Sequence, residues 1–394
     1  MNLHFENTAI AFRYKKSKEL KLSKWIFTFL KMPMLNTIGI KLILFLLRIK
    51  FPIGNILKKT IFKQFVGGET LLEAGKLADK LKEYNIQIIL DYGVEGNNNE
   101  QDFEKTSEQL INVIQFAQTR SNIPFISIKI TGIASTQLLK ILNDEPRLRS
   151  GIHDNEGQMR SFNKIRDRIY KIAEIGYNNK IGILIDAEES WIQDPIDRLA
   201  IELMELYNTK MPIIFNTYQL YRHDRLKFLQ INHKIASEKK FILGAKIVRG
   251  AYMEKERSRA EKHSYYSPIH INKTLVDEDF NATIDYCLMN IDTISTIVAT
   301  HNEDSCIFTT QKMADYQIPF NHPHVWFSQL YGMSDHISFN LSKLNYNVAK
   351  YVPFGPLKEV MPYLIRRADE NSSVSNQSNR YLQLINLELK KRKI

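Results

Sequence analysis

The chain has 394 residues, of which 44% are hydrophobic and 25% are charged, so it can bury a sizeable core and is not a disordered tract. Its two cysteines, Cys287 and Cys306, form no CxxC pair, which argues against a disulfide scaffold or a thiolate zinc site and fits a reducing compartment. The formal net charge of +11 comes from basic residues spread without a long Lys/Arg block, so we expect no nucleic-acid partner.

The N-terminal segment is basic and, over residues 22–49, strongly apolar. Residues 1–20 contain Glu6 and Glu19 and no apolar run, which is unlike a secretory signal. The longest uninterrupted apolar piece, Leu42–Leu47, is far shorter than the ~20 residues of a spanning helix. We predict that residues 1–66 form a basic amphipathic helical arm, which either packs on the core or lies on a membrane surface.

Eight short runs rich in Ile, Val and Phe follow from residue 86 onward, and they are apolar on both faces, as buried parallel strands are. The predicted strands are Ile86–Asp91, Phe125–Thr131, Ile181–Ala187, Pro212–Tyr218, Phe241–Arg249, Ile294–Thr300, His324–Leu330 and Val348–Phe354. Helical stretches separate them, including Phe103–Arg120, Asp194–Tyr207, Leu226–Ser237, Leu275–Asn290 and Asp304–Tyr316, and residues 134–180 form a longer excursion with two helical patterns.

This alternation predicts an α/β fold, a (β/α)8 TIM-type barrel over residues 67–394 preceded by the N-terminal helical arm. A doubly wound open sheet is the alternative. The first predicted strand lacks the G-x-G-x-x-G turn that dinucleotide-binding sheets of that kind use, so the barrel is favoured.

Polar or charged residues close several of the apolar strands, and in a barrel the chemistry collects at these carboxyl ends. Each residue alone has an ordinary explanation, such as a rim ion pair or a core histidine. Together around one mouth they favour a ligand site. They are Lys129, Asp186, Glu188, Gln219, Lys246, Arg249, His301, Asn302, Leu330, Tyr331 and Tyr351.

The composition of this set narrows the chemistry. No His and carboxylate cluster has metal-ligand spacing, so we predict no metal, and no G-x-S-x-G elbow is present. Cationic, amide and aromatic side chains without a nucleophile indicate an anionic cofactor that carries the reaction. Lys246 and Arg249 lead into a Gly250-Ala251 turn, whose backbone can approach a flavin and its phosphates closely.

A helix is predicted to begin after Pro356, at the end of the last strand. Tyr363, Arg366 or Arg367, and Glu370 then fall on one stripe of that helix. Adjacent guanidinium groups suit a carboxylate because each donates paired N–H groups. The alternative is a solvated face with an internal salt bridge.

Taken together, these segments resemble the FAD-dependent proline dehydrogenases, in the monofunctional form of the mitochondrial-type branch. The motifs occur in order over about residues 60–380, as Ser127–Thr131, Ile185–Glu188, Phe215–Tyr221, Gly244–Arg257, Ala299–Asn302, Gln329–Met333, Lys350–Gly355 and Tyr363–Asn371. The resemblance implies oxidation of L-proline to Δ1-pyrroline-5-carboxylate by hydride transfer to FAD, with the electrons passed on to a membrane quinone.

The resemblance also implies roles for individual residues. Arg366, Arg367 and Lys129 would hold the proline carboxylate, and Asp186 would order the pocket. The walls around the pyrrolidine ring would be Tyr252, Leu330, Tyr351 and Tyr363. The FAD contacts would be Gln219, Lys246, Arg249, Gly250, Ala251, Thr300, His301, Asn302 and Glu370. Lys246 is a departure, because the bacterial bifunctional branch has arginine there, so flavin tuning at this position does not transfer.

The implied partners are L-proline, a quinone and a separate pyrroline-5-carboxylate dehydrogenase that receives the product. The implied location is cytoplasmic and peripheral on the inner face of a bacterial membrane. Three alternatives stay open. A hydroxyproline dehydrogenase is disfavoured by Tyr351, since an aromatic beside ring carbon C4 leaves little room for a hydroxyl. The others are a flavin-free lyase that uses Lys129 or Lys246, and a basic binding module without catalysis.

Overall fold

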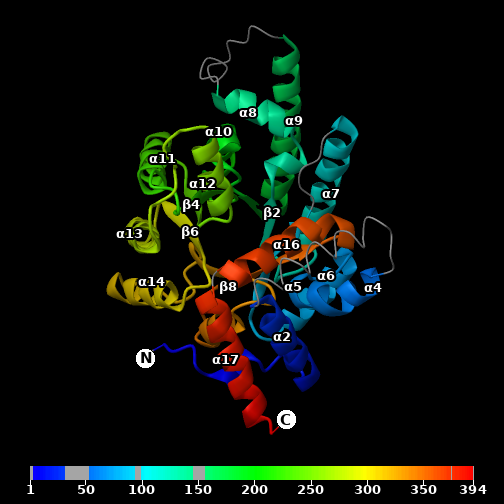
Figure 1. Ribbon diagram of the computed structural model, residues 1–394. Coiled ribbons are helices and arrows are strands. Elements are labelled where there is room, and N and C mark those ends of the chain that lie inside the picture. Colours follow the sequence, from blue (N-terminus) through cyan, green and yellow to red (C-terminus); the bar gives the residue numbers. More distant parts are fainter. Residues whose placement is uncertain (1–2, 32–52, 94–98, 145–155, 374, 394) are drawn as a thin grey trace. The chain divides into compact units, whose positions relative to one another are not determined.

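The computed structural model describes residues 3–31, 53–93, 99–144, 156–373 and 375–393. Its eight strands are hydrogen-bonded in chain order into a closed barrel, which confirms the predicted (β/α)8 class (Figure 1). The strands are β1 (Gln87–Tyr92), β2 (Phe125–Ile128), β3 (Gly182–Ile185), β4 (Ile214–Gln219), β5 (Leu243–Val248), β6 (Ile294–Ala299), β7 (Val325–Leu330) and β8 (Val348–Phe354).

The strands form because their residues can be buried on both faces. Every residue of β2, β3, β4 and β8 is buried. The observed strand pairs are parallel, with β1 aligned to β8 from Gln87 opposite Ala349 to Tyr92 opposite Phe354. The predicted second strand was too long, because the chain leaves β2 after Ile128 and turns into the 3-10 segment η2 (Ile130–Gly132). Lys129 therefore lies just beyond the strand.

The helices cover the positions predicted for them, and residues 134–180 do form two helices. The helices are α1 (Thr8–Ala11), α2 (Ser17–Leu30), α4 (Gly54–Leu57), the π-helix η1 (Lys58–Phe62), α5 (Lys63–Phe65), α6 (Leu71–Lys82), α7 (Glu100–Gln118), α8 (Thr136–Asp144), α9 (Glu156–Asn179), α10 (Ser190–Tyr207), α11 (Arg225–Lys239), α12 (Met253–Lys262), α13 (Lys273–Met289), α14 (Glu303–Asp315), α15 (Asp335–Lys343), α16 (Leu357–Ser373) and α17 (Ser375–Lys391). Side-chain caps define several starts, as where Thr70 accepts the Glu73 N–H at α6 and Asn272 accepts the Leu275 N–H at α13.

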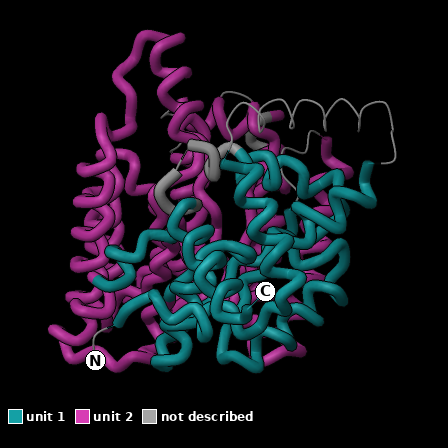
Figure 2. Tube along the Cα trace, turned by 60° about the horizontal axis from the view of Figure 1, so that its bottom comes forward, with its two compact units in different colours: residues 1–93, 301–307, 327–394 teal, residues 94–300, 308–326 magenta. Residues whose placement is uncertain are grey.

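The chain divides into two compact units (Figure 2). Unit 1 consists of residues 1–93, 301–307 and 327–394, and it holds β1 and β8 with the helices α1, α2, α4–α6 and α15–α17. Unit 2 consists of residues 94–300 and 308–326, and it holds β2–β6 with the helices α7–α13. Both units contribute residues to β7 and α14. We describe each unit by itself.

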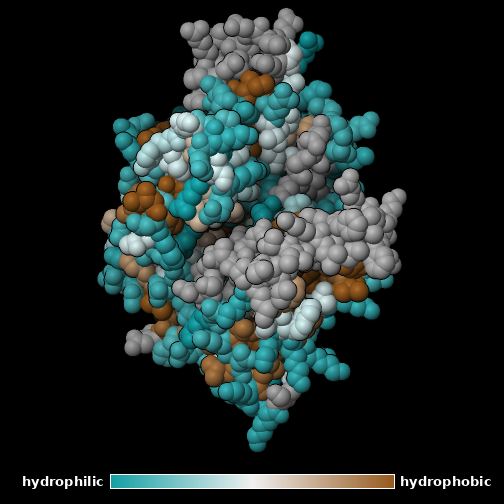
Figure 3. Space-filling model, viewed as in Figure 1, coloured by the Kyte–Doolittle hydropathy of each residue, from teal (hydrophilic) through white to brown (hydrophobic). Residues whose placement is uncertain are grey.

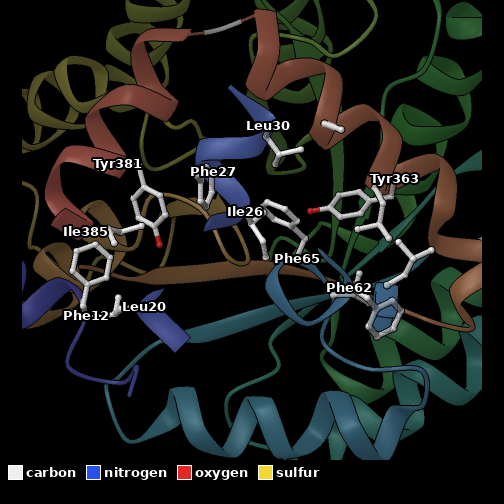
Figure 4. Packing of buried hydrophobic residues seen from close by; sticks show 14 of the residues in the cluster. Phe12, Leu20, Ile26, Phe27, Leu30, Phe62, Phe65, Tyr363, Tyr381 and Ile385 are labelled. Carbon is white, nitrogen blue, oxygen red and sulfur yellow. The ribbon is translucent and has the colours of Figure 1, made fainter. Parts of the chain in front are cut away.

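In unit 1, the described part of the N-terminal arm is built into a hydrophobic cluster (Figure 4). The buried stripe of α2 includes Leu20, Ile26 and Phe27, at the spacing of one helix face. It packs against α17, where the Tyr381 ring lies 5.0 Å from that of Phe27. Phe65 of α5 completes this contact, with its ring centroid 5.8 Å from that of Phe27. The apolar residues 32–52 lie outside the described part of the chain.

The surface in view is mainly hydrophilic, with hydrophobic side chains in separate patches (Figure 3). Among the described residues, no helix has the length and apolar character needed to cross a bilayer.

Candidate active site

In unit 2, a buried ion pair lies where β3 ends. The Lys246 ammonium of β5 donates to Asp186 Oδ1 at 2.5 Å, and the Ser127 hydroxyl of β2 donates to the same oxygen at 2.7 Å. Lys246 and Asp186 are 6% and 9% exposed, so the pair is nearly removed from water. Ser127 precedes Lys129 by two positions, and it was missed in the sequence because nothing local marks it as a carboxylate partner.

Two lysines act on this single carboxylate. Burial alone would raise the pKa of Asp186, but Lys246 and Lys129 together with the hydrogen bonds hold the pKa below its ordinary value. Asp186 therefore stays charged.

Glu188 is a second buried carboxyl group in unit 2, and it fixes two neighbouring segments. Its carboxyl oxygens accept the Thr131 N–H at 3.0 Å and the Thr131 hydroxyl at 2.5 Å, which holds the turn that follows Lys129. Its backbone carbonyl accepts the Gln219 amide at 2.8 Å. Burial raises the pKa of Glu188 to about 7, because the hydrogen bonds from Thr131 only partly offset the loss of water.

Arg249 follows β5 and is oriented by partners in unit 2. Its Nε donates to Asp277 at 2.8 Å and an Nη to Thr300 at 2.7 Å, while the guanidinium lies 4.2 Å from the centre of the Phe280 ring. Arg249 and Thr300 were both predicted to contact FAD, so the structure brings these two together. Asp277 was missed, because a helix residue so far along the chain carries no local sign of the pairing.

The Gly250-Ala251 turn comes next and is exposed. Gly250 has φ 133°, and a Cβ there would come within 2.5 Å of the Tyr221 ring, so only glycine fits. Tyr252 ends the turn at the start of α12 and is half-buried.

In unit 1, α16 carries the predicted stripe, and it begins after Pro356 as expected. Glu69 accepts the Leu357 N–H at 3.3 Å, and the Tyr92 hydroxyl donates to Glu359 at 3.1 Å, so the first turn is held at two points. Along the helix, the Arg367 guanidinium lies 5.1 Å from the centre of the Tyr363 ring.

The stripe is more buried than a solvated face would be. Tyr363 and Arg367 are 5% and 6% exposed, whereas Arg366 is only half-buried. Tyr363 belongs to the hydrophobic cluster of the N-terminal arm, where Figure 4 shows its ring beside that of Phe65. The side chain of Glu370 lies outside the described residues.

The other predicted residues of unit 1 lie around the end of β7. Leu330 and Tyr351 are register partners of β7 and β8, and Leu330 packs against the same cluster as Tyr363. The His301 Nδ1 is 2.9 Å from the Ser334 hydroxyl. Asn302 was predicted to contact FAD, and its side-chain oxygen accepts the Ser305 N–H at 3.1 Å at the start of α14.

Each unit thus gathers one group of predicted residues. Unit 2 holds Lys129, Asp186, Gln219, Lys246, Arg249, Gly250, Ala251, Tyr252 and Thr300, and unit 1 holds His301, Asn302, Leu330, Tyr351, Tyr363, Arg366 and Arg367. Among the described residues, no cluster of His, Cys, Asp and Glu could hold a metal ion.

A closed parallel barrel with eight strands in chain order defines a (β/α)8-barrel protein. The sequence model of proline dehydrogenase matches residues 74–380. The chain belongs to the proline dehydrogenase family.

Individual relatives agree with this assignment. Mitochondrial proline dehydrogenase 1 of Dictyostelium discoideum is 32% identical over 382 residues, which cover 86% of this chain and 66% of that protein. Hydroxyproline dehydrogenase of Xenopus laevis is 31% identical over 366 residues, or 85% of this chain and 78% of that protein. The crystal structure of proline utilization A (PutA) from Bdellovibrio bacteriovorus, inactivated by N-propargylglycine, has a TM-score of 0.71 at 21% identity, covers 82% of this chain and 34% of that one, and supports the fold.

The raised pKa of Glu188 predicts a pH-dependent stability. The folded state keeps the proton up to about pH 7, while the unfolded chain releases it near the ordinary glutamate value, so this contribution to stability is lost as the pH rises between the two. Glu188→Gln keeps the side-chain shape but cannot ionise. The free energy of unfolding of this variant, relative to that of the parent chain, should therefore be about 2.5 kcal/mol higher at pH 8 than at pH 5. Denaturant unfolding at both pH values measures this, and parallel pH profiles of the two proteins would contradict it.

Proposed function

We propose that this protein oxidises L-proline to Δ1-pyrroline-5-carboxylate. The observation that carries the proposal is the adjacent Arg366 and Arg367 on a partly buried, anchored helix of a proline dehydrogenase family barrel. Paired guanidinium groups recognise a carboxylate through parallel N–H donors, and burial strengthens the attraction. The D. discoideum relative supports L-proline as the substrate.

In this proposal, Arg366, Arg367 and Lys129 bind the substrate carboxylate. Tyr363 stacks under Arg367 and limits its rotation, which holds the guanidinium in a binding orientation. The ring of the substrate lies among Tyr252, Leu330, Tyr351 and Tyr363. Asp186 orders the pocket by holding Lys246 in place.

The cofactor in this proposal is FAD, which supplies a hydride acceptor when bound. The donor set fits a group with phosphates and an electron-accepting ring. Lys246 and Arg249 supply positive charge, and the exposed glycine turn at Gly250 admits a close approach to backbone. The residues that would hold it are Gln219, Lys246, Arg249, Gly250, Ala251, Thr300, His301, Asn302 and Glu370. A quinone would take the electrons, and a separate pyrroline-5-carboxylate dehydrogenase would take the product.

Anaerobic addition of L-proline tests the activity directly. We expect flavin absorbance in the purified protein and its bleaching by L-proline. Arg367→Met should raise the L-proline concentration for half-maximal bleaching by about 10- to 100-fold, because a charge-assisted hydrogen bond pair is lost.

Lys234→Met is the matched control, since Lys234 is a 79% exposed cation on α11. It should bleach like the parent protein. An absence of flavin, or flavin that L-proline leaves oxidised, would exclude this function and favour the lyase or the binding module.

Tyr351 is proposed to set the preference for L-proline over hydroxyproline. Its side chain is 8% exposed, and in this proposal its ring fills the space beside the substrate. Tyr351→Ser opens that space, and we expect the ratio of kcat/KM for hydroxyproline to that for L-proline to rise by about tenfold. Tyr351→Phe is the control that keeps the ring. An unchanged ratio in the serine variant would refute the steric explanation.

We also propose that residues 1–66 act as an arm that attaches the protein to the inner face of a membrane, where a quinone is available. The exposed side of α2 carries Lys18, Lys21, Trp25 and Phe29, and the last two rings stack at 6.1 Å. Trp25 is 59% exposed. Aromatic and lysine side chains on one helix face are typical of an interfacial contact with anionic lipid.

Co-sedimentation with vesicles tests the attachment. The protein should pellet with vesicles that contain anionic lipid, and Trp25→Ser combined with Phe29→Ser should weaken this several-fold. The matched control replaces the exposed Tyr266 and Ile271 of unit 2 with Ser, and we expect it to bind vesicles like the parent protein. Equal partition with and without vesicles would refute the proposal.

A further inference from the structure

Unit 1 contains a buried charge cluster that none of the proposed ligand contacts uses. Its centre is Asp335, the first residue of α15, whose side chain is 0% exposed. Lys15 lies 3.1 Å and Lys350 3.0 Å from its carboxylate oxygens. The hydroxyls of Tyr14 and Tyr381 donate to the same carboxylate at 2.9 and 2.6 Å.

The two lysines maintain the charge of Asp335, whereas burial lowers the pKa of Lys350 and its attraction to Asp335 offsets this only in part. Burial alone would raise the pKa of Asp335, but Lys15 and Lys350 hold the pKa well below its usual range. Removing a partner from a buried charge is costly, since the remaining group has lost its water as well. The cluster therefore constrains the positions of all the segments that supply it.

Lys350 connects the cluster to the residues proposed to touch the substrate. It precedes Tyr351 in β8, and its ammonium donates to the Met333 carbonyl at 2.5 Å and lies 3.4 Å from the Leu330 carbonyl. The Tyr331 N–H donates to the Tyr351 carbonyl at 2.8 Å. These hydrogen bonds thus hold the turn between β7 and α15 against β8, next to Leu330 and Tyr351, which are proposed to line the pocket.

Two further contacts make this turn rigid. Gly332 has φ 78°, and a Cβ there would come within 1.9 Å of the Gln64 carbonyl oxygen, while the Gln64 amide donates to the Gly332 carbonyl at 2.6 Å. Ser334, immediately before Asp335, holds His301 through the 2.9 Å contact. A shift of Asp335 would therefore be transmitted to Leu330 and His301.

We propose that Asp335 and Lys350 are positioning residues, which set the substrate-side turn at residues 330–334 without touching the substrate. The inference rests on the proposed function for its kinetic consequence. Tyr14, Lys15 and Tyr381 lie outside the matched residues 74–380, so segments at both ends of the chain complete the cluster. In this proposal, Tyr14 and Lys15 of the N-terminal arm thus help to position the turn.

The test uses Asp335→Asn, which keeps the side-chain size and an oxygen acceptor but removes the charge. We expect the KM for L-proline to rise by about tenfold while kcat changes less, since ground-state binding depends on the turn. Lys350→Met should have a similar effect. The double variant should be no worse than either single variant, because both act through one contact.

Asn208→Ala is the matched control for a loss of stability alone. Asn208 is fully buried at the amino ends of β4 and β5, where its side chain makes hydrogen bonds to Ile213, Ile214 and Ile242. It should lower the unfolding temperature with an unchanged KM. If the KM of the Asp335→Asn variant is also unchanged, the proposal is overturned.

Amide hydrogen exchange gives a readout that does not depend on the activity. Exchange across residues 327–338 should be faster in Asp335→Asn than in the parent protein and unchanged in Asn208→Ala. If L-proline fails to reduce the parent protein, the proposed function falls, and the exchange rates alone decide on the positioning role. If Asp335→Asn does not fold, Lys15→Met takes its place, because it keeps the Asp335–Lys350 pair. Unchanged amide exchange over residues 327–338 in that variant would contradict the proposal.

Discussion

A buried charged group is stable only when an opposite charge lies beside it within the fold. In unit 1 the buried Asp335 carboxylate is such a group. The Asp335 carboxylate of α15 is contacted by two lysines and two tyrosine hydroxyls, which come from three other segments. Desolvation of these groups costs several kcal/mol for each ion, which only good pairing geometry offsets. A single carboxylate therefore fixes four parts of unit 1 relative to one another: α15, β8, α17 and the segment that precedes α2.

The same constraint operates in unit 2, with a different result. Asp186 is paired with Lys246 of β5 and lies near Lys129, while Asp186 and Lys129 directly follow strands of the parallel barrel. In the proposed function, the same two lysines also face an anionic ligand. In unit 1 the partners of the Asp335 carboxylate are themselves buried, including the hydroxyls of Tyr14 and Tyr381 that donate to it.

In helix α16, core packing and the proposed ligand recognition share residues. Tyr363 lies in the hydrophobic cluster with α2, α5 and α17, yet its ring also supports the Arg367 guanidinium. Glu69 and Tyr92 hold the first turn of the helix. Because the Arg367 geometry depends on this packing, a change in α2 or α5 should also alter the position of Arg367.

Much of the fold could be predicted from the sequence, since strands buried on both faces and amphipathic helices have a local signature. The eight strands, the two helices within residues 134–180 and the start of α16 after Pro356 were predicted in this way, with boundaries wrong by a few residues at β2 and α10. The adjacent arginines and the glycine turn were also visible, because neighbours in the chain remain neighbours on a helix or at a strand end.

What only the tertiary structure decided is the pairing of charges. Ser127 and Lys246 meet at Asp186, Asp277 orients Arg249, and Tyr14 reaches Asp335 across a separation of 321 residues. No periodicity in the sequence marks such partners, because an ion pair depends on distance in space and on loss of water, and both arise only when the barrel and the terminal helices have packed.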